Sequence, residues 1–255
     1  MAGRNRLVCI TGASSGIGEA FALHHARRGD DLILVGRDEE QLRRVARVAT
    51  EIGAHVEVVG ADLSVPNGVD VASRTAERAD IVVLNAGITH AAATGRSDLE
   101  HLDRLAYLMS AGVVRFCESV VPHMVERRSG TVVVVSSIAA FTPMRKSAPY
   151  AAAKSHATAY ARSLAAEVES KGVRVLAVCP GYVHTDLHRR AGLGHLVTSI
   201  PSWMWLEPDA VVAATDRALR GKKNVVVPGV VYRLVLPFLA SSLAQRTWTR
   251  LSRRR

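Results

Sequence analysis

Short runs of aliphatic and β-branched residues alternate along the chain with longer stretches typical of helices. Runs without a polar face indicate strands buried on both sides, as in a parallel sheet covered by helices on each face. The pattern predicts an α/β fold, namely one Rossmann-like, doubly wound domain with a seven-stranded parallel sheet. The expected strands lie at residues 7–11, 32–36, 55–60, 80–85, 131–137, 174–179 and 224–228.

The composition is consistent with a single folded domain. The chain has 255 residues, of which 48% are hydrophobic and 22% are charged, and this suits an α/β domain that needs no disulfides. Cys9, Cys117 and Cys179 lie far apart and form no CxxC pair, so neither a disulfide framework nor a zinc site is expected. The first residues hold no apolar secretion signal. We therefore expect a cytoplasmic protein whose main domain spans residues 1–228.

Positive charge is concentrated at the C-terminal end. The formal net charge is +10, and residues 229–255 contain six arginines and no acid, which leaves 10 − 6 = +4 for the rest. Charge placed in this way does not favour a nucleic-acid partner, and we expect none. The segment is too short and too proline-broken to span a membrane. Two interpretations of this basic tail stay open: a packed helix with a frayed end, or an amphipathic helix in peripheral contact with an anionic membrane.

A glycine-rich turn directly follows the first predicted strand and precedes an amphipathic stretch. Gly12 permits a tight turn, Gly16 lets the backbone approach a pyrophosphate, and Gly18 allows close helix packing. Free N–H groups and the positive dipole end at the start of a helix favour a phosphate. The turn therefore predicts a dinucleotide site lined by Gly12, Ser14, Ser15, Gly16, Ile17 and Gly18.

The end of the second predicted strand indicates which dinucleotide binds. Gly36 occupies the place where an acid would hydrogen-bond a free ribose 2′-hydroxyl, and Arg37 follows it. A guanidinium neutralises a 2′-phosphate and can form paired hydrogen bonds with it. The sequence thus predicts NADP(H) as the cofactor. The alternative is that Arg37 is a solvated side chain at the start of a charged helix.

Two further strand ends carry residues suited to a cofactor. Asp62 and Leu63 follow the third predicted strand, and Asn85, Ala86 and Gly87 follow the fourth. Open α/β sheets bind ligands beyond the carboxyl ends of their strands, where short residues let adenine and ribose approach. We expect all five residues to line the cofactor. For Asp62, an almost equal alternative is that it caps the next helix.

Tyr150 and Lys154 are spaced i, i+4 in a stretch typical of a helix. This spacing places the phenol and the ammonium on one helical face, where the cation is expected to lower the phenol pKa. Tyr150 would then act as a general acid or base. Ser137 ends the fifth predicted strand, where its hydroxyl would orient a carbonyl or alcohol or, alternatively, cap the following turn. Strand alternation points Ser136 to the opposite face.

Taken together, these motifs resemble the short-chain dehydrogenase/reductase superfamily. They are TGASSGIG, NAG, a serine thirteen residues before YAAAK, and PGYVHT, and the resemblance spans roughly residues 6–228. It implies hydride transfer between NADP(H) and a ketone or secondary alcohol, with Ser137, Tyr150 and Lys154 as catalytic residues. Lys154 would also hold the nicotinamide ribose. The nicotinamide end would contact Pro180, Gly181, Val183 and Thr185.

The chain departs from this resemblance at one position. Family members usually carry an asparagine three residues before the glycine matched by Gly112, and here that residue is Met109. A thioether accepts hydrogen bonds weakly and donates none, so it cannot hold the relay water that the asparagine holds. Ser110 faces elsewhere if the segment is helical. Besides a reductase, the sequence therefore leaves open an NADP(H)-binding sensor or scaffold with little turnover.

The longest irregular stretch, residues 184–208, is predicted to form a substrate lid. Its apolar side chains favour a lipophilic ketone or an acyl chain, although packing on the core explains its tryptophans equally well. Its histidines have no acidic partner in a metal-site pattern, so no metal is expected. The VVPG run and the basic tail also resemble, more distantly, reductases of long-chain 3-oxoacyl groups, including mycolate-reductase-like members. The resemblance implies a homodimer or homotetramer formed through helices near 98–128 and 148–171. The lid residues concerned are His184, His188, Leu193, His195, Leu196, Trp203, Met204 and Trp205.

Overall fold

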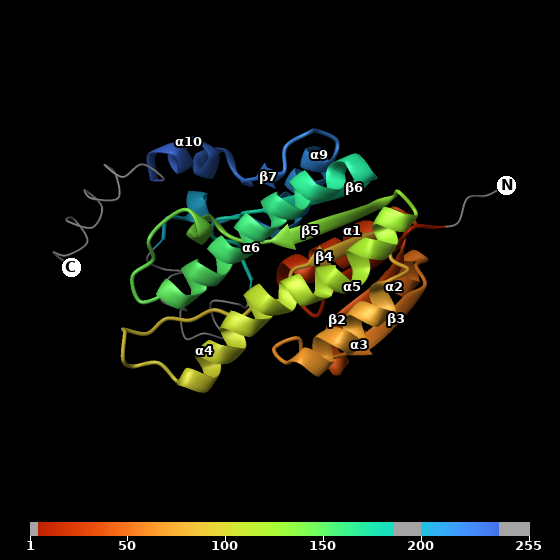
Figure 1. The fold of residues 1–255 in the computed structure, drawn as a ribbon, viewed down its shortest axis with the longest axis horizontal. Helices are drawn as coiled ribbons and strands as arrows, with labels where there is room; N and C mark the ends of the chain where they lie inside the picture. The colour runs from red at the N-terminus through yellow and green to blue at the C-terminus, as the bar shows by residue number, and fades with distance from the viewer. Residues whose placement is uncertain (1–4, 186–199, 240–255) are drawn as a thin grey trace.

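The computed structural model describes residues 5–185 and 200–239. They form one seven-stranded sheet in the order β3-β2-β1-β4-β5-β6-β7, in which every neighbouring pair is parallel (Figure 1). This confirms the predicted fold class. The strand order reverses between β1 and β4, which opens a crevice at the carboxyl ends of these strands. The strands are β1 (Leu7–Thr11), β2 (Asp31–Gly36), β3 (Val56–Gly60), β4 (Ile81–Leu84), β5 (Gly130–Val135), β6 (Val173–Val178) and β7 (Val225–Val226).

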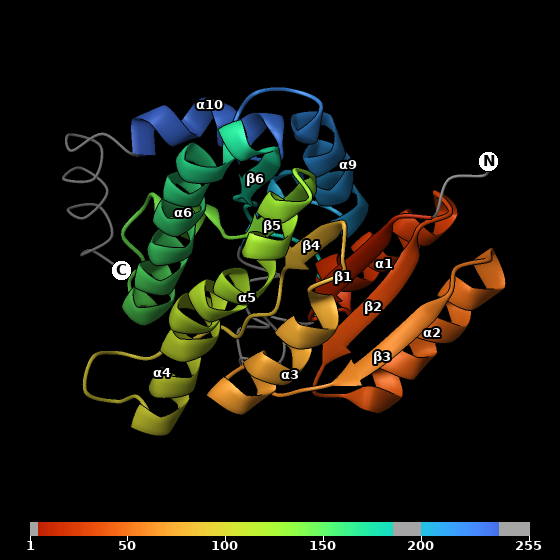
Figure 2. The ribbon, with the colours of Figure 1, turned by 45° about the vertical axis from the view of Figure 1, so that its right-hand side comes forward.

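Helices cover both faces of the sheet (Figure 2). Alternate strand residues point to opposite faces: Val8 and Ile10 join the core on one side, and Cys9 joins the core on the other. The first face packs against α1 (Gly16–Arg27), α2 (Glu39–Ile52) and α9 (Pro208–Leu219), and the second against α3 (Pro66–Ala76), α5 (Gly112–Glu126) and α6 (Ala148–Val168).

One long helical stretch, Leu99–Glu126, combines α4 (Leu99–Ala106), a π-helical turn η1 (Tyr107–Ala111) and α5. By length and composition alone it could cross a membrane, and it is the one described helix with that property. Phe116, Val120 and Met124 of α5 are buried in the core beside the sheet. We therefore treat α5 as a core helix. The π-helical turn was not predicted from the sequence.

The last described helix, α10 (Val230–Leu239), begins just beyond the predicted domain boundary at residue 228. Its Tyr232 is buried, and the Tyr232 hydroxyl accepts a hydrogen bond from the Tyr182 backbone N–H at 3.0 Å. The packed domain thus extends past residue 228. The rest of the basic tail, from residue 240 onward, lies outside the described residues.

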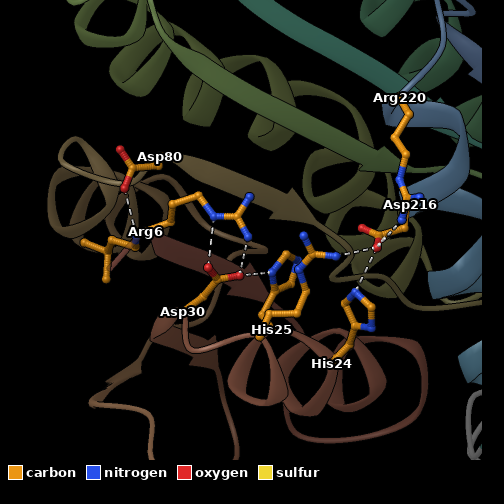
Figure 3. Close-up of polar contacts among 9 residues, drawn as sticks. Arg6, His24, His25, Asp30, Asp80, Asp216 and Arg220 are labelled. Carbon is orange, nitrogen blue, oxygen red and sulfur yellow. Dashed lines mark hydrogen bonds and ion pairs between the residues drawn. The ribbon is translucent and has the colours of Figure 1, made fainter. Parts of the chain in front are cut away.

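At the amino ends of the strands, a polar network joins β1 to the turn before β2 (Figure 3). Asp30 accepts two hydrogen bonds from Arg6, both at 2.9 Å, and its Oδ2 lies 2.7 Å from His25 Nδ1. Burial alone would raise the pKa of Asp30, but the hydrogen bonds from His25 and Arg6 outweigh it and hold this pKa below its usual range. This network therefore ties the turn before β2 to the residue that precedes β1.

Candidate active site

A cavity of about 1000 Å³ lies at the carboxyl edge of the sheet. It is lined by segments that follow six different strands, β1 to β6. All the residues predicted to bind a cofactor or to catalyse line this cavity except Gly18, which lies beneath the glycine-rich turn. The predicted residues that line it are Gly12, Ser14, Ser15, Gly16, Ile17, Arg37, Asp62, Leu63, Asn85, Ala86, Gly87, Ser137, Tyr150, Lys154, Pro180, Gly181, Val183 and Thr185.

The glycine-rich turn has the backbone that its glycines were expected to permit. Gly12 and Gly16 have φ values of +65° and +59°, in the left-handed region that side chains disfavour. At Gly18, a Cβ would overlap the carbonyl oxygen of Gly12 and approach Asn85 Nδ2 to 2.7 Å. Ser15, the N-cap residue of α1, makes no side-chain capping hydrogen bond. The start of α1 therefore presents its free end to the cavity.

Thr11, which the sequence reasoning did not single out, organises this turn. Its Oγ1 accepts hydrogen bonds from the backbone N–H groups of Asn85 at 2.9 Å and Ala86 at 3.0 Å. In return, Asn85 Nδ2 donates to the carbonyl oxygens of Thr11 at 3.1 Å and Gly12 at 3.2 Å. The Asn85 amide thus clamps the glycine-rich turn to the end of β4. The feature of the sequence that could have indicated this role is a threonine at the end of a buried strand, immediately before the first glycine of the turn.

Arg37 and Asp62 lie at the end of the cavity formed by β2 and β3. The Arg37 side chain is exposed there. Asp62 Oδ1 accepts hydrogen bonds from Ser64 N at 3.0 Å and Ser64 Oγ at 2.7 Å, and its Oδ2 pairs with Arg104. Burial raises the Asp62 pKa, but these bonds and the charges of Arg104 and Arg37 outweigh it and lower the pKa overall. Since α3 begins at Pro66 after Val65, Asp62 is not its N-cap.

Tyr150 and Lys154 lie one turn apart on α6, and both face the cavity. Lys154 is buried, and its Nζ lies 5.8 Å from the centre of the Tyr150 ring. The ammonium donates a hydrogen bond to the Val135 carbonyl oxygen at 2.9 Å. This bond fixes the lysine to the end of β5. The Lys154 ammonium is therefore held near the Tyr150 ring.

Ser137 lies beyond the end of β5, in extended backbone that leads into the short η2 helix (Ile138–Ala140). Its Oγ accepts a hydrogen bond from Ala139 N at 3.1 Å, so it caps the turn as the alternative interpretation proposed. The same hydroxyl lines the cavity, and its interaction with the Tyr150 phenol lowers the pKa of that phenol. Ser136 instead donates to the Lys154 carbonyl oxygen at 2.8 Å. Ser137 thus both caps the turn that follows β5 and faces the cavity.

The expected lowering of the Tyr150 pKa by Lys154 is wrong for this structure. Burial raises the Tyr150 pKa, and the interaction with Ser137 offsets only part of that rise. Burial also lowers the Lys154 pKa, to about 8. Withdrawing each group from water favours its neutral form, and burial is the largest cause of both pKa shifts. A protonated phenol at neutral pH follows.

The buried ammonium gives a pH-dependent prediction. Between about pH 8 and the ordinary lysine pKa of about 10.4, the unfolded chain holds a proton at Lys154 that the folded chain has released. Raising the pH through this window therefore stabilises the folded wild type relative to Lys154→Met, by at most about 1.4 kcal/mol per pH unit. Urea unfolding of both proteins from pH 7 to pH 10 measures the difference. A difference that stays flat or falls would contradict the assigned pKa.

Met109 lies in the π-helical turn η1 and is buried beside Lys154. A Cβ built at Gly87 would lie 3.2 Å from Met109 Sδ and 3.6 Å from Lys154 Nζ, which places the thioether in the pocket around the lysine. Met109 lines the cavity. π-Helical turns inside α-helices often occur at functional sites. Met109, which the resemblance matches to the usual asparagine, thus lies near Lys154 in the wall of the cavity.

The far wall of the cavity was not foreseen from the sequence. The turn that precedes α6 is tied to the segment after β4, because Ser147 Oγ donates to the His90 carbonyl oxygen at 2.6 Å and Ala92 N donates to the Lys146 carbonyl oxygen at 2.8 Å. The sequence offered little indication of this contact, because neither segment is a helix or a strand and neither has a periodic pattern. The cavity-lining residues of these segments are Ile88, Thr89, Ala91, Met144, Arg145, Lys146 and Ser147.

The predicted lid is described only in part, since Leu193, Leu196, His188 and His195 fall within residues 186–199, outside the described residues. Trp205 is buried, and its ring stacks on His184 with centroids 4.8 Å apart. Leu206 pairs with Val183 in a parallel β-bridge. Trp205 thus packs on the core, as the alternative interpretation proposed, whereas Trp203 is exposed.

Comparison with known proteins agrees with the fold. The family model for short chain dehydrogenases matches residues 6–194. A Myxococcus xanthus protein named as an oxidoreductase is 33% identical over 186 residues, which cover 71% of this chain and 74% of that protein. A short-chain dehydrogenase from Sphingobium yanoikuyae in complex with NADPH is 29% identical, with a TM-score of 0.83 over 97% of this chain and 95% of that chain. The bulky-bulky ketone specific alcohol dehydrogenase from Comamonas testosteroni is 25% identical, with a TM-score of 0.78 over 97% and 94%. The chain belongs to the short-chain dehydrogenase/reductase family and is an oxidoreductase of that family.

Proposed function

We propose that this protein is an NADP(H)-dependent reductase of a lipophilic ketone or 3-oxoacyl compound. The observation that carries the proposal is the convergence of Tyr150, Lys154 and Ser137 on the cavity that the glycine-rich turn also lines. The cavity fits a dinucleotide, because the absent Cβ atoms of Gly12 and Gly16 leave backbone open at the free end of α1. When bound, NADP(H) supplies or accepts the hydride.

The side chains divide the remaining work. Tyr150 donates its proton to the carbonyl oxygen of the substrate, and its raised pKa keeps that proton available at neutral pH. Ser137 Oγ orients the same oxygen by a hydrogen bond. Lys154, held by the Val135 carbonyl oxygen, stabilises the tyrosinate that forms and binds the ribose. The same groups run the reverse reaction on an alcohol.

The preference for NADP(H) is assigned to Arg37. Its exposed guanidinium at the cavity end suits a 2′-phosphate, and the related Sphingobium yanoikuyae enzyme was solved in complex with NADPH. Replacing Arg37 by Asp is expected to lower the ratio of kcat/KM for NADPH to that for NADH by about 10–100-fold, because a charge-assisted hydrogen bond is lost and repulsion replaces it.

Steady-state kinetics with both cofactors measure this ratio. Arg47→Asp is the matched control, since Arg47 is also exposed on α2 but does not line the cavity, and it should leave the ratio unchanged. An unaltered ratio in Arg37→Asp would reject the assignment of Arg37 to the 2′-phosphate.

A lipophilic substrate is suggested by the apolar side chains around the catalytic groups, among them Ile88, Leu108, Ile138 and Met144. The related Comamonas testosteroni enzyme is named for bulky-bulky ketones. The test is a panel of carbonyl compounds, from small ketones to long 3-oxoacyl thioesters, scored by NADPH consumption. Activity that rises with chain length supports the proposal, and activity confined to small polar carbonyls rejects it. Homo-oligomerisation through α4, α5 and α6 stays a prediction.

A second candidate function is suggested by Met109. If the thioether prevents proton relay past Lys154, the protein would bind NADP(H) as a sensor or scaffold with little turnover. Met109→Asn is expected to retain or raise kcat, because an amide can hold a water beside the lysine. Met109→Leu is the matched control, since it keeps an apolar side chain of similar size. If the wild type has no turnover and Met109→Asn gains it, the sensor is favoured. If Met109→Asn loses turnover while its fold stays intact, the placement of Met109 beside the lysine is contradicted.

A further inference from the structure

Two adjacent cations, Arg145 and Lys146, line the cavity just before α6 begins. Both residues are exposed, and neither was singled out from the sequence. Lys146 lies four residues before Tyr150, so their Cα atoms are at most about 14 Å apart. A positive charge therefore lies near the phenol that is assigned to the substrate carbonyl.

The backbone of Lys146 has a conformation that a glycine would adopt more easily. Its φ is +59°, in the left-handed region that side chains disfavour. The segment after β4 holds it there, because the Lys146 carbonyl oxygen accepts a hydrogen bond from Ala92 N at 2.8 Å. The next residue, Ser147, donates its own hydrogen bond to the His90 carbonyl oxygen at 2.6 Å. Residues held in disfavoured conformations cluster at ligand sites, and here two contacts hold the backbone that carries the lysine.

The charges along the cavity differ between its two ends. The described carboxylates that line it are at the end formed by β2 and β3, and they are Asp38 and Asp62. At the α6 end, the charged lining residues of the described part are all cations: Arg145, Lys146 and Lys154. A cleft lined by one sign of charge attracts ligands of the opposite sign. The α6 end therefore favours a substrate with an anionic group.

We propose that Lys146 binds a carboxylate of the substrate, which is then an oxo acid whose ketone and carboxylate are joined by an apolar chain. An ammonium binds a carboxylate by charge-assisted hydrogen bonds. Apolar residues that line the same wall, including Ile88 and Met144, suit the chain between the two groups. The contact positions the ketone relative to Tyr150. This inference rests on the proposed function, because it names the substrate class of that reductase.

The test compares methyl-ketone acids of short, medium and long chain with their methyl esters, which lack the negative charge. Isothermal titration calorimetry with the protein saturated with NADP⁺ measures binding without turnover, because the oxidised cofactor has no hydride to give. The wild type is expected to bind at least one acid about tenfold more tightly than its ester, and salt should reduce this preference. Lys146→Met should remove the preference, whereas Lys146→Arg should keep most of it.

Lys222→Met is the matched control, because Lys222 is also exposed but is not among the residues that line the cavity. It should keep the preference of the wild type for the acid. Equal binding of acid and ester by the wild type would overturn the proposal, as would equal losses in Lys146→Met and Lys222→Met. NADPH affinity should not change in Lys146→Met, and a loss of it would assign the cation to the cofactor instead.

NADPH consumption with the same compounds tests the proposed function separately. An acid that binds through Lys146 and is reduced supports both proposals. An acid that binds through Lys146 and is not reduced would reject the reductase and leave the carboxylate site in place. Reduction of acid and ester with the same kcat/KM would support the reductase and reject the carboxylate site.

Discussion

Tyr150→Phe is expected to lower kcat for carbonyl reduction by about 10²–10⁴-fold, the usual contribution of a positioned general acid. The change removes one oxygen and keeps the ring that lies beside the Lys154 ammonium. The phenol faces the cavity, and burial raises its pKa further above neutral pH, so it carries its proton there. Its loss therefore removes the proton donor. NADPH consumption with the best substrate of the panel measures the effect.

Tyr160→Phe is the matched control for this prediction. Tyr160 lies on the same helix, α6, and is not among the residues that line the cavity, so the control loses the same oxygen away from the site. Its kcat should stay close to that of the wild type. NADPH binding should persist in both variants, because neither change touches the glycine-rich turn. Turnover in Tyr150→Phe above about a tenth of the wild-type value would mean that another group donates the proton.

Gly18→Ala is expected to weaken NADPH binding by about 100-fold or more and to lower the free energy of unfolding by about 1–3 kcal/mol. A Cβ at this position would overlap the Gly12 carbonyl oxygen and lie 2.7 Å from Asn85 Nδ2. Both neighbours belong to the clamp that holds the glycine-rich turn against β4, so neither can move independently. The turn itself must shift, and with it the N–H groups at the start of α1. Fluorescence titration with NADPH and urea unfolding measure the two effects.

Gly221→Ala adds the same methyl group where there is room for it. The nearest atom to a Cβ at Gly221 is the Ala218 carbonyl oxygen at 3.5 Å, an ordinary contact, and Gly221 lies after α9, away from the cavity. We expect its NADPH affinity and stability to match those of the wild type within about threefold and about 0.5 kcal/mol. Comparable NADPH binding by Gly18→Ala and the wild type would show that the turn tolerates the displacement.

The protonation of the catalytic pair illustrates the limit of local sequence reasoning. The spacing of Tyr150 and Lys154 correctly placed both groups on one helical face, since that depends only on the helical repeat. Their pKa values depend above all on burial, which segments distant in the chain produce. Burial reversed the expected direction for Tyr150.

Other features of the site likewise depend on contacts between distant segments. The clamp between Thr11 and Asn85 joins the ends of two neighbouring strands that are 74 residues apart in the chain. The π-helical turn that carries Met109 interrupts one long helix beside Lys154. Neither arrangement has a periodic signature, because each results from packing between elements. The sequence motifs located the site, and packing decided its detailed geometry.

The sequence by itself determined the α/β class, the seven strands and the residues at the strand ends that line the cavity, because these follow from hydrophobic periodicity, turn chemistry and the common edge at which parallel strands end. The tertiary structure decided how Ser137 combines capping with the cavity, that Trp205 packs on the core, and that Tyr232 of α10 belongs to the folded domain. Each of these depends on which distant surfaces come together and exclude water, and no local pattern of residues records that.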